Sequence, residues 1–372
     1  MARLRARFDE ASVDAYFGVR REHMRYLTGL ALGDGEEKVA GNSGQFVVSG
    51  NEVVVLADSR YRIQARREAP DARIFEAYND LPTRWPDLLA SVGARRVAVE
   101  AGFVSHALWE RLAAAAPEVE LVPVEGWVEA DRATKEPAEI ERIAAACAVA
   151  DRALAALLPD IRPGATEADL ALQLEWLMRT GGAEALAFDV ACLSGPEAAL
   201  PHGAPGDRPI QAGSVLLFDF GAQVAGYRSD MTRTLFVGEP SARDLEIYAL
   251  VARAQREAIV ALERAVAVDA PRPSGRAIDA VARGVIEAAG HGDHFGHGTG
   301  HGIGLATHEQ PSLGRFAADS PLPSPTVFSV EPGVYLDGEM GVRIEDLVRF
   351  DAEAGLVERL TKFPREIIAL PG

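Results

Sequence analysis

The segment His297-Gly-Thr-Gly-His301-Gly-Ile-Gly-Leu-Ala-Thr-His308 is the most informative part of this 372-residue chain. It sets three histidines among four regularly spaced glycines, and six of the chain's eight histidines fall between His202 and His308. The glycine spacing is not that of a phosphate-binding P-loop, and no Lys-Ser or Lys-Thr pair follows it. Close packing of the backbone around His301 explains the glycines better, so we expect a tight turn that presents this imidazole.

Four carboxylates in apolar surroundings accompany the histidines. Asp219 lies between two phenylalanines near the end of an apolar strand, and Asp230 follows eleven residues later on the strand that we expect to return beside it. Glu331 and Glu345 belong to two further strands that are equally apolar. Buried acids repel one another, and each is costly unless a cation pairs with it. The sequence therefore predicts a cation at the place where these strands meet.

Two kinds of cation could balance these acids. Arg233 and Arg343 are close enough in sequence to form salt bridges with them. A site rich in oxygen ligands with one imidazole also suits Mn, Co, Fe or Zn, and four carboxylates suit a pair of ions better than one. For the set as a whole we favour metal over salt bridges.

The chain divides into two patterns of secondary structure. Up to about residue 130, short apolar strands alternate with helical segments, which predicts a small α/β layer. From Thr134-Lys-Glu-Pro137 onward, pairs of helices are interleaved with strands that we expect to be antiparallel, which predicts an α+β domain. We place the boundary near residue 133, so the expected domains are 1–133 and 134–372.

The expected elements of the first domain are strands at 14–19, 45–48, 53–57, 96–100 and 120–124, and helices near 61–69, 86–92 and 107–115. In the second domain we expect helices from Pro137, from the capping box at 166–169, and near 241–268 and 276–289. Its expected strands are 215–220, 227–236, 327–330, 342–350 and 356–360.

Composition excludes several classes of function. The chain has 38 Lys and Arg against 55 Asp and Glu, a formal charge of −17, whereas nucleic-acid binders present clustered basic residues. Its two cysteines, Cys147 and Cys192, cannot form a disulfide framework and are expected to be buried thiols in a reducing compartment. No secretory h-region and no membrane-length apolar run is present, so we expect a soluble, cytoplasmic protein with neither nucleic-acid nor membrane partners.

The order of these motifs resembles that of the pita-bread metallopeptidases. Besides Asp219, Asp230 and the 297–308 segment, the resemblance is carried by Ser329-Val-Glu331-Pro-Gly-Val-Tyr335 and Gly341-Val-Arg-Ile-Glu345-Asp. The segments that resemble the proline-specific branch are Tyr26-Leu-Thr-Gly29, Asp58-Ser-Arg-Tyr61 and Thr134-Lys-Glu-Pro-Ala-Glu139. The resemblance covers essentially the whole chain. It implies a pita-bread (creatinase/aminopeptidase-like) catalytic domain of the α+β class, preceded by a smaller α/β creatinase-like domain.

The resemblance also implies roles for individual residues. Two divalent ions, Mn first and Co, Zn or Fe as alternatives, would be held by Asp219, Asp230, His301, Glu331 and Glu345. Asp219 would chelate the first ion, Asp230 and Glu345 would bridge both, and the other two would complete the second. His202 and His308 match the family's two active-site histidines that are not ligands. Glu331 is also the candidate for moving a proton from water to the leaving nitrogen.

The implied activity is hydrolysis of the Xaa-Pro bond in dipeptides with proline at the second position, by a homodimer. The alternative is an Xaa-Pro aminopeptidase that acts on longer peptides. A dipeptidase would bind the free carboxylate of proline with a cation such as Arg315, whereas an aminopeptidase would leave a groove for the rest of the peptide. The acidic loop 34–38 could instead close over the site of a neighbouring subunit. Segment 320–325 departs from the Gly-Met usual in this branch.

Alternatives outside this branch fit less well. A methionine aminopeptidase would not need the N-terminal domain, and creatinase lacks the metal ligands that this chain keeps. A catalytically inactive pita-bread binding module is the alternative from another class, but such proteins typically lose ligand residues.

Overall fold

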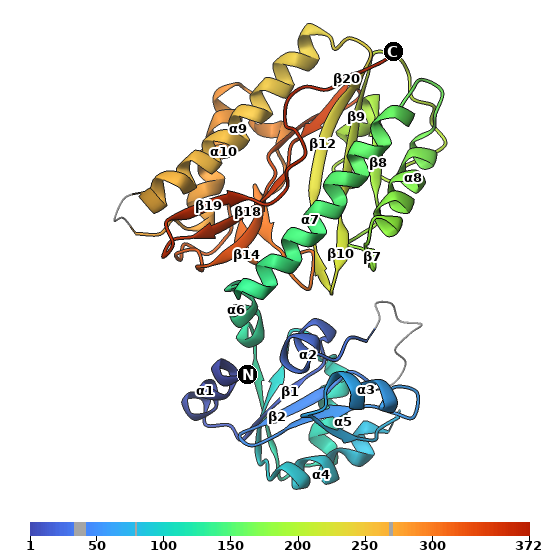
Figure 1. Ribbon diagram of the computed structural model, residues 1–372. Helices are drawn as coiled ribbons and strands as arrows, with labels where there is room; N and C mark the ends of the chain where they lie inside the picture. The colour runs from blue at the N-terminus through green and yellow to red at the C-terminus, as the bar shows by residue number, and fades with distance from the viewer. Residues whose placement is uncertain (33–41, 79, 268–270) are drawn as a thin grey trace. The chain divides into compact units, whose positions relative to one another are not determined.

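The computed structural model describes residues 1–32, 42–78, 80–267 and 271–372 (Figure 1). Over these residues the chain divides into two compact units, Met1–Arg132 and Ala133–Gly372. The acidic loop 34–38 and the last residue of the helix expected over 241–268 lie outside the described residues. None of the described helices combines the length and the apolar character that a membrane span requires.

The first unit contains a six-stranded mixed sheet with the strand order β4-β3-β2-β1-β5-β6. β2 is antiparallel to β1 and β3, and the remaining neighbours are parallel. The strands are β1 (Ala15–Gly18), β2 (Phe46–Ser49), β3 (Val53–Leu56), β4 (Arg73–Phe75), β5 (Arg96–Glu100) and β6 (Glu120–Val124). The helices are α1 (Ala2–Ala11), α2 (Arg21–Thr28), α3 (Arg62–Glu68), α4 (Leu81–Val92), α5 (His106–Ala115) and α6 (Trp127–Ala133).

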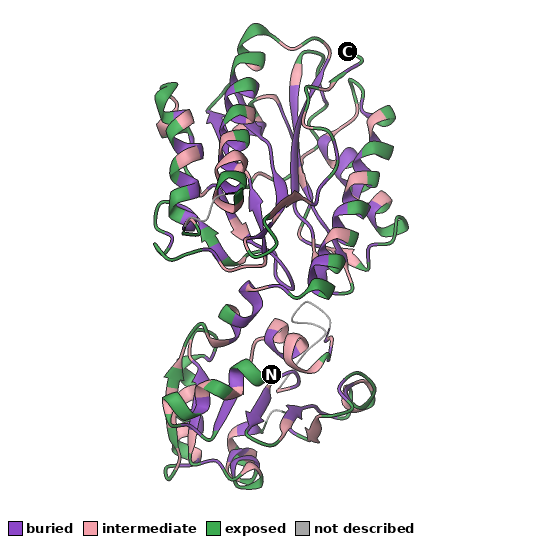
Figure 2. Cartoon of the chain, turned by 60° about the vertical axis from the view of Figure 1, so that its left-hand side comes forward, coloured by how far each residue is buried: buried purple, intermediate pink, exposed green. Residues whose placement is uncertain are grey.

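Apolar side chains are buried on both faces of this sheet, whose strands are largely purple in Figure 2. Successive side chains of a strand point to opposite faces. Phe17 accordingly packs in one core with Trp85 of α4, and Tyr16 packs in the other with Met24 of α2. Coverage of both faces explains why these strands are continuous apolar runs rather than alternating ones.

The helix expected over 86–92 is longer than predicted. α4 begins at Leu81, and Pro86 lies inside it rather than at its start. A proline in the first helical turn, here Pro82, sacrifices no hydrogen bond. The side chains that α4 buries are Leu81, Trp85, Leu88 and Leu89, and burial of this face outweighs the backbone hydrogen bond that Pro86 cannot make.

The second unit contains four long helices and several small sheets. Its helices are α7 (Pro137–Leu157), α8 (Glu167–Thr180), α9 (Ala242–Ala267) and α10 (Gly275–Ala288). The strands of its first half are β7 (Ala185–Leu186), β8 (Ala191–Ser194), β9 (Ser214–Phe220), β10 (Ala222–Val224), β11 (Tyr227–Arg228) and β12 (Met231–Val237). Those of its second half are β13 (Gly300–Gly302), β14 (Glu309–Leu313), β15 (Thr326–Val330), β16 (Gly333–Leu336), β17 (Met340–Arg343), β18 (Asp346–Asp351), β19 (Leu356–Arg359) and β20 (Ala369–Leu370).

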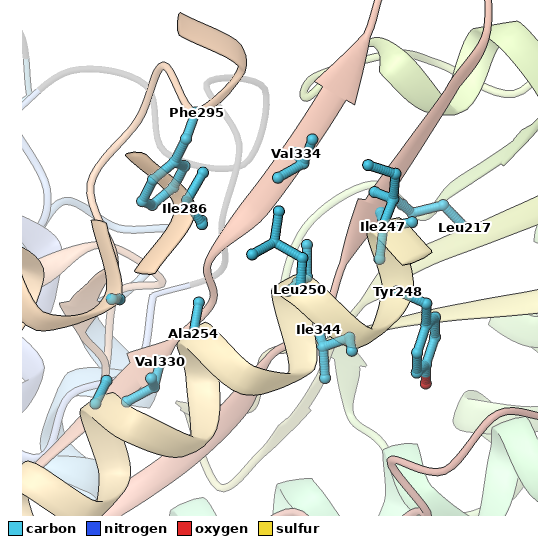
Figure 3. Packing of buried hydrophobic residues seen from close by; sticks show 14 of the residues in the cluster. Leu217, Ile247, Tyr248, Leu250, Ala254, Ile286, Phe295, Val330, Val334 and Ile344 are labelled. Carbon is cyan, nitrogen blue, oxygen red and sulfur yellow. The ribbon is translucent and has the colours of Figure 1, made fainter. Parts of the chain in front are cut away.

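Two pairs of helices enclose these strands, as Figure 1 shows. α7 and α8 pack against the sheet β20-β12-β9-β8 through a core that includes Phe218 and the free, buried Cys192. Cys147 on α7 is also buried and free, as expected. On the other side, Ile247 of α9 and Ile286 of α10 belong to a core with strands of the second half (Figure 3). The polar residues discussed below lie on the strands between these two cores.

Two strands predicted as continuous are interrupted. The strand expected over 227–236 is β11 and β12, separated at Ser229-Asp230, and the one expected over 342–350 is β17 and β18, separated at Ile344-Glu345. At each break the chain changes partner: β11 pairs with β10 but β12 with β9, and β17 pairs with β16 but β18 with β15. The pattern of apolar and polar residues along one segment does not show which strand it pairs with, so the sequence could not predict these changes of partner. Both interruptions place an acidic residue outside the regular ladder.

Candidate metal centre

All seven residues singled out in the sequence line one cavity of about 420 Å³ in the second unit. They are His202, Asp219, Asp230, His301, His308, Glu331 and Glu345. The strands explain the convergence. Asp219 lies on β9, Asp230 directly precedes β12, and these two strands pair in antiparallel register. Glu331 directly follows β15, which pairs with the strand that carries His301.

The glycines around His301 are required by close backbone contacts. A Cβ atom added at Gly300 would overlap the carbonyl oxygen of Ser329, and one added at Gly302 would overlap that of Gln310. β13 is therefore pressed between β14 and β15, which fixes the direction of the His301 side chain. This agrees with the sequence interpretation of the glycines as packing residues.

The closest group in the cavity consists of Asp230, His301 and Glu345, which offer ligand atoms within 4.8 Å of one another. His301 Nε2 lies 3.2 Å from Glu331 Oε1 and 3.6 Å from Asp230 Oδ2. The opposite ring nitrogen, Nδ1, lies 3.1 Å from the Gly302 carbonyl oxygen. Because a carbonyl accepts only from an N–H, this contact keeps a proton on Nδ1, so Nε2 is the nitrogen that would bind a metal after giving up its own proton.

Burial and mutual repulsion dominate the electrostatics of the acids. Burial, followed by the neighbouring carboxylates, raises the pKa of Asp230 and of Glu345 well above the usual range. Burial also acts on Glu331, but the hydrogen bond and charge of His301 outweigh it and lower the pKa of Glu331 to about 2. Despite its own burial, the pKa of His301 is raised to about 9, chiefly by Glu331. Asp230 and Glu345 thus lack compensating positive charge, which a bound divalent cation would supply.

Individual oxygen atoms support the same conclusion. Asp219 Oδ1 and Glu345 Oε1 are buried acceptors without a hydrogen-bond partner in the described structure. Buried polar atoms are almost always satisfied, so each such atom needs an explanation. Two of the other carboxylate oxygens accept from hydroxyls: Thr232 donates to Glu345 Oε2 at 2.7 Å, and Ser329 donates to Glu331 Oε1 at 3.1 Å. Four oriented carboxylates and one imidazole fit divalent ions such as Mn, Co, Fe or Zn.

Salt bridges account for only one of the four acids. Arg343 Nη2 lies 2.5 Å from Asp219 Oδ2. Arg233 instead pairs with Asp346, at 2.7 Å. Among the described residues, the other three acids of the set have no Lys or Arg as an ion-pair partner. Arginine salt bridges therefore explain Asp219 in part and His301 faces Glu331, but no Lys or Arg of the described residues balances Asp230 or Glu345.

A chain of hydrogen bonds leads from Asp219 to His297. Arg343 Nη1 donates to the Tyr335 hydroxyl at 2.9 Å, and this hydroxyl lies 2.7 Å from His297 Nε2. His297 Nδ1 faces the carbonyl oxygen of Gly298 at 2.7 Å, so Nδ1 carries the proton and Nε2 accepts from tyrosine. His297 thus orders the loop by hydrogen bonding.

The two remaining histidines line the cavity without joining the cluster of acids. The His308 ring centroid lies 4.3 Å from that of His301. Burial, and then the proximity of His301, lowers the pKa of His308, which favours its neutral form. His202 lines the same cavity on the segment that follows η3 (Gly195–Ala199). Both imidazoles can therefore contact a ligand held at the acids.

Sequence reasoning missed several residues of this site. Thr232 and Ser329 each lie two residues from a predicted ligand and hence on the same side of an extended segment, a signal that was available. Tyr335 was noticed only as part of a motif, and Phe188 in the cavity wall was not noticed.

Arg315 lies beside a second cavity of about 640 Å³. This cavity adjoins the first, since His297, Gly298 and Ser312 line both. Arg315 Nη2 forms an ion pair with Glu287 at 2.8 Å. The proposed anchor thus already has a carboxylate partner.

Residues 141–352 match the family model for metallopeptidase family M24, and residues 1–134 match the creatinase/prolidase N-terminal domain. The chain belongs to metallopeptidase family M24. It is 31% identical over 361 residues to the Xaa-Pro dipeptidase of Pyrococcus furiosus, covering 97% of both chains. These matches confirm the resemblance and the predicted fold class.

Two solved structures are similar to this chain over nearly its whole length. An Xaa-Pro dipeptidase from Bacillus anthracis has a TM-score of 0.88 and 34% identity, covering 99% of this chain and 98% of that one. An X-Pro aminopeptidase from Thermotoga maritima MSB8 has a TM-score of 0.87 and 34% identity, covering 99% of both chains. Two structures that are equally identical to this chain are thus named differently, one as a dipeptidase and the other as an aminopeptidase.

Proposed function

We propose that this M24 protein is a dinuclear metallopeptidase that hydrolyses the Xaa-Pro bond and releases the N-terminal residue. The observation that carries the proposal is the convergence of four carboxylates and one imidazole in a single cavity, with two buried carboxylate oxygens lacking a hydrogen-bond partner in the described structure. An inactive binding module would not need to retain this full and electrostatically costly set. The family membership supports the same activity.

The metal ligands in this proposal are Asp219, Asp230, His301, Glu331 and Glu345. A bound pair of divalent ions would lower the pKa of a shared water toward neutrality and polarise the peptide carbonyl. Glu331 accepts the proton of the attacking water and delivers it to the leaving nitrogen of proline. His308 and His202 donate hydrogen bonds to the carbonyl oxygen and the substrate backbone, which stabilise the negative charge that develops there.

A comparison of peptides tests this function. The protein supplied with Mn, Co or Zn should hydrolyse Ala-Pro-Ala and leave Ala-Ala-Ala intact. Asp230→Ala should reduce the bound metal below two ions per chain and abolish hydrolysis, because it deletes one member of the Asp230, His301 and Glu345 group. Absence of cleavage with every metal would refute the enzyme, and full activity of Asp230→Ala would refute the role of this aspartate.

The second cavity bears on the length of the substrate. Only one residue precedes the bond that is cleaved, so a cavity adjoining the catalytic one can receive only the part of the peptide that follows proline. The described cations that line the two cavities already have carboxylate partners: Arg343 with Asp219, Arg283 with Asp279, and Arg315 with Glu287. We therefore propose peptides of three or more residues as the preferred substrates, which is the aminopeptidase alternative.

The dipeptide substrate expected first from the sequence is the competing possibility. We expect kcat/KM for Ala-Pro-Ala to exceed that for Ala-Pro by about tenfold or more, since added contacts in a subsite are worth this much. Arg315→Ala should not selectively lower the value for Ala-Pro. A preference for Ala-Pro, or its selective loss in Arg315→Ala, would establish the dipeptidase with Arg315 as its carboxylate anchor.

Four further expectations stay predictions. They are manganese as the preferred metal, a homodimer, a cytoplasmic location and a domain boundary near residue 133. Reconstitution with single metals, light scattering coupled to gel filtration, cell fractionation and limited proteolysis test them in that order.

A further inference from the structure

The loop that carries His308 is held in place by atoms outside the catalytic cavity. The backbone N–H of Arg228 donates to the Gly304 carbonyl at 2.9 Å, and Arg228 Nη1 donates to the Thr307 hydroxyl at 3.1 Å. Within the loop, the N–H of Gly304 donates to the Ala306 carbonyl at 3.0 Å. These contacts fix the segment just before His308.

Glu309, the residue after His308, turns its carboxylate back into this loop. Its Oε2 atom lies 3.4 Å from the Ala306 N–H, and its Oε1 atom lies so close to Gly304 that a Cβ atom there would overlap it. The Glu309 carboxylate therefore packs against residues 304–306 of the loop, and His308 lies between these residues and β14.

Lys135 supplies the opposite charge. Its Nζ atom donates to Glu309 Oε1 at 2.6 Å, and the exposed fractions of the two side chains are 0% and 4%. The backbone N–H of Lys135 donates to the Pro325 carbonyl at 2.8 Å, so the lysine is fixed at both ends. Neither Lys135 nor Glu309 is among the residues that line the catalytic cavity.

A buried ion pair of this kind is a weak source of stability, because desolvation of both charges offsets their attraction. It does favour one arrangement of Glu309, since in any other this buried carboxylate would lose the lysine that faces it. Here the ion pair fixes the position of Glu309, the residue that follows His308. A small displacement of a group that contacts the reacting atoms is costly to the rate.

We infer that Lys135, acting through Glu309, is a positioning residue that holds His308 at the substrate carbonyl. The inference rests on the role of His308 in the function proposed above. Lys135 lines no part of the catalytic cavity, and the effect that we assign to it passes through the 304–309 loop. It follows that loss of the lysine should lower kcat without loss of metal.

The test combines Lys135→Met with His308→Ala. Lys135→Met should lower kcat for Ala-Pro-Ala by about 10- to 100-fold, with KM and metal content close to those of the wild-type protein. In the His308→Ala background, Lys135→Met should change kcat by less than about twofold, because a residue that acts through His308 has nothing left to position. An equal loss in both backgrounds, or unchanged kcat in Lys135→Met alone, would overturn the inference.

Two further variants keep the test decisive. If Lys135→Met alone does not fold, the double replacement Lys135→Met/Glu309→Leu removes both charges together; it should fold, bind metal and show the same loss of kcat, and normal kcat would overturn the inference. Arg7→Met breaks another largely buried ion pair, Arg7–Asp131, and should lower Tm without changing kcat. Unchanged kcat in His308→Ala alone would instead refute the proposed role of His308.

Discussion

The Ser329 hydroxyl offers a sharp test of the proposed metal centre because it contacts two of the proposed ligands and is not itself one of them. It is fully buried, accepts from the backbone N–H of His301 at 3.0 Å, and donates to Glu331 Oε1 at 3.1 Å. Ser329→Ala removes both contacts and leaves all five proposed ligands in place. We expect this variant to bind metal more weakly and to be moderately less stable.

The size of the effect follows from these two contacts. A hydrogen bond to a charged group contributes about 1.5–3 kcal/mol, and leaving the buried N–H of His301 without an acceptor costs about 1–3 kcal/mol. Loss of an outer contact to a metal ligand typically weakens metal binding about 10- to 100-fold. That range corresponds to about 1.4–2.8 kcal/mol, so the two estimates agree. Loss of the acceptor for the His301 N–H should lower the free energy of unfolding, and loss of the hydrogen bond to Glu331 should lower metal affinity.

The same strand provides a matched control. Thr326 is also fully buried on β15, but its hydroxyl has no hydrogen-bond partner in the described structure. Thr326→Val keeps the shape and should leave metal affinity unchanged. Metal affinity is measured by competition with a chelating indicator, and stability by thermal unfolding of the metal-free proteins. Equal metal affinity in Ser329→Ala and the wild-type protein would refute the reasoning.

Three other predictions concern the surrounding structure. Tyr335→Phe removes the hydroxyl between His297 and Arg343 and should lower kcat about tenfold at unchanged metal content; an unchanged kcat would contradict this. Gly300→Ala should reduce Tm and metal content together, because the added Cβ atom would overlap the Ser329 carbonyl oxygen. A wild-type Tm would contradict this by showing that β13 can shift to accommodate the methyl group. Arg233→Met breaks a fully buried ion pair with Asp346 and should lower the free energy of unfolding by about 3–5 kcal/mol. Urea titration measures this value, and a loss below about 1 kcal/mol would contradict the isolation of the pair from water.

The sequence predicted the residues of the cavity better than the strands that carry them. The ligand types, their spacing and the glycines at 298–304 are local features, and they point to one chemistry wherever the strands lie. The breaks before β12 and β18 are different, because a change of strand partner depends on residues far along the chain. Asp230 and Glu345 were therefore predicted as site residues while their local structure was predicted wrongly.

The partners of charged residues were the least predictable feature. Arg233 and Arg343 were equivalent candidates for salt bridges in the sequence, yet only Arg343 reaches one of the four acids. Lys135 marked the domain junction, but its partner Glu309 lies 174 residues later. Such pairings are decided by the packing of whole elements, and no local pattern records them.

The number of metal ions bound per chain is the most direct test of a dinuclear centre. We predict that metal-free protein, titrated with Mn and followed by calorimetry and elemental analysis, binds two ions, and that hydrolysis of Ala-Pro-Ala rises with their binding. Asp230→Ala should bind fewer than two and remain inactive. A wild-type protein that binds no divalent ion, or that cleaves the peptide equally well without one, would contradict the account.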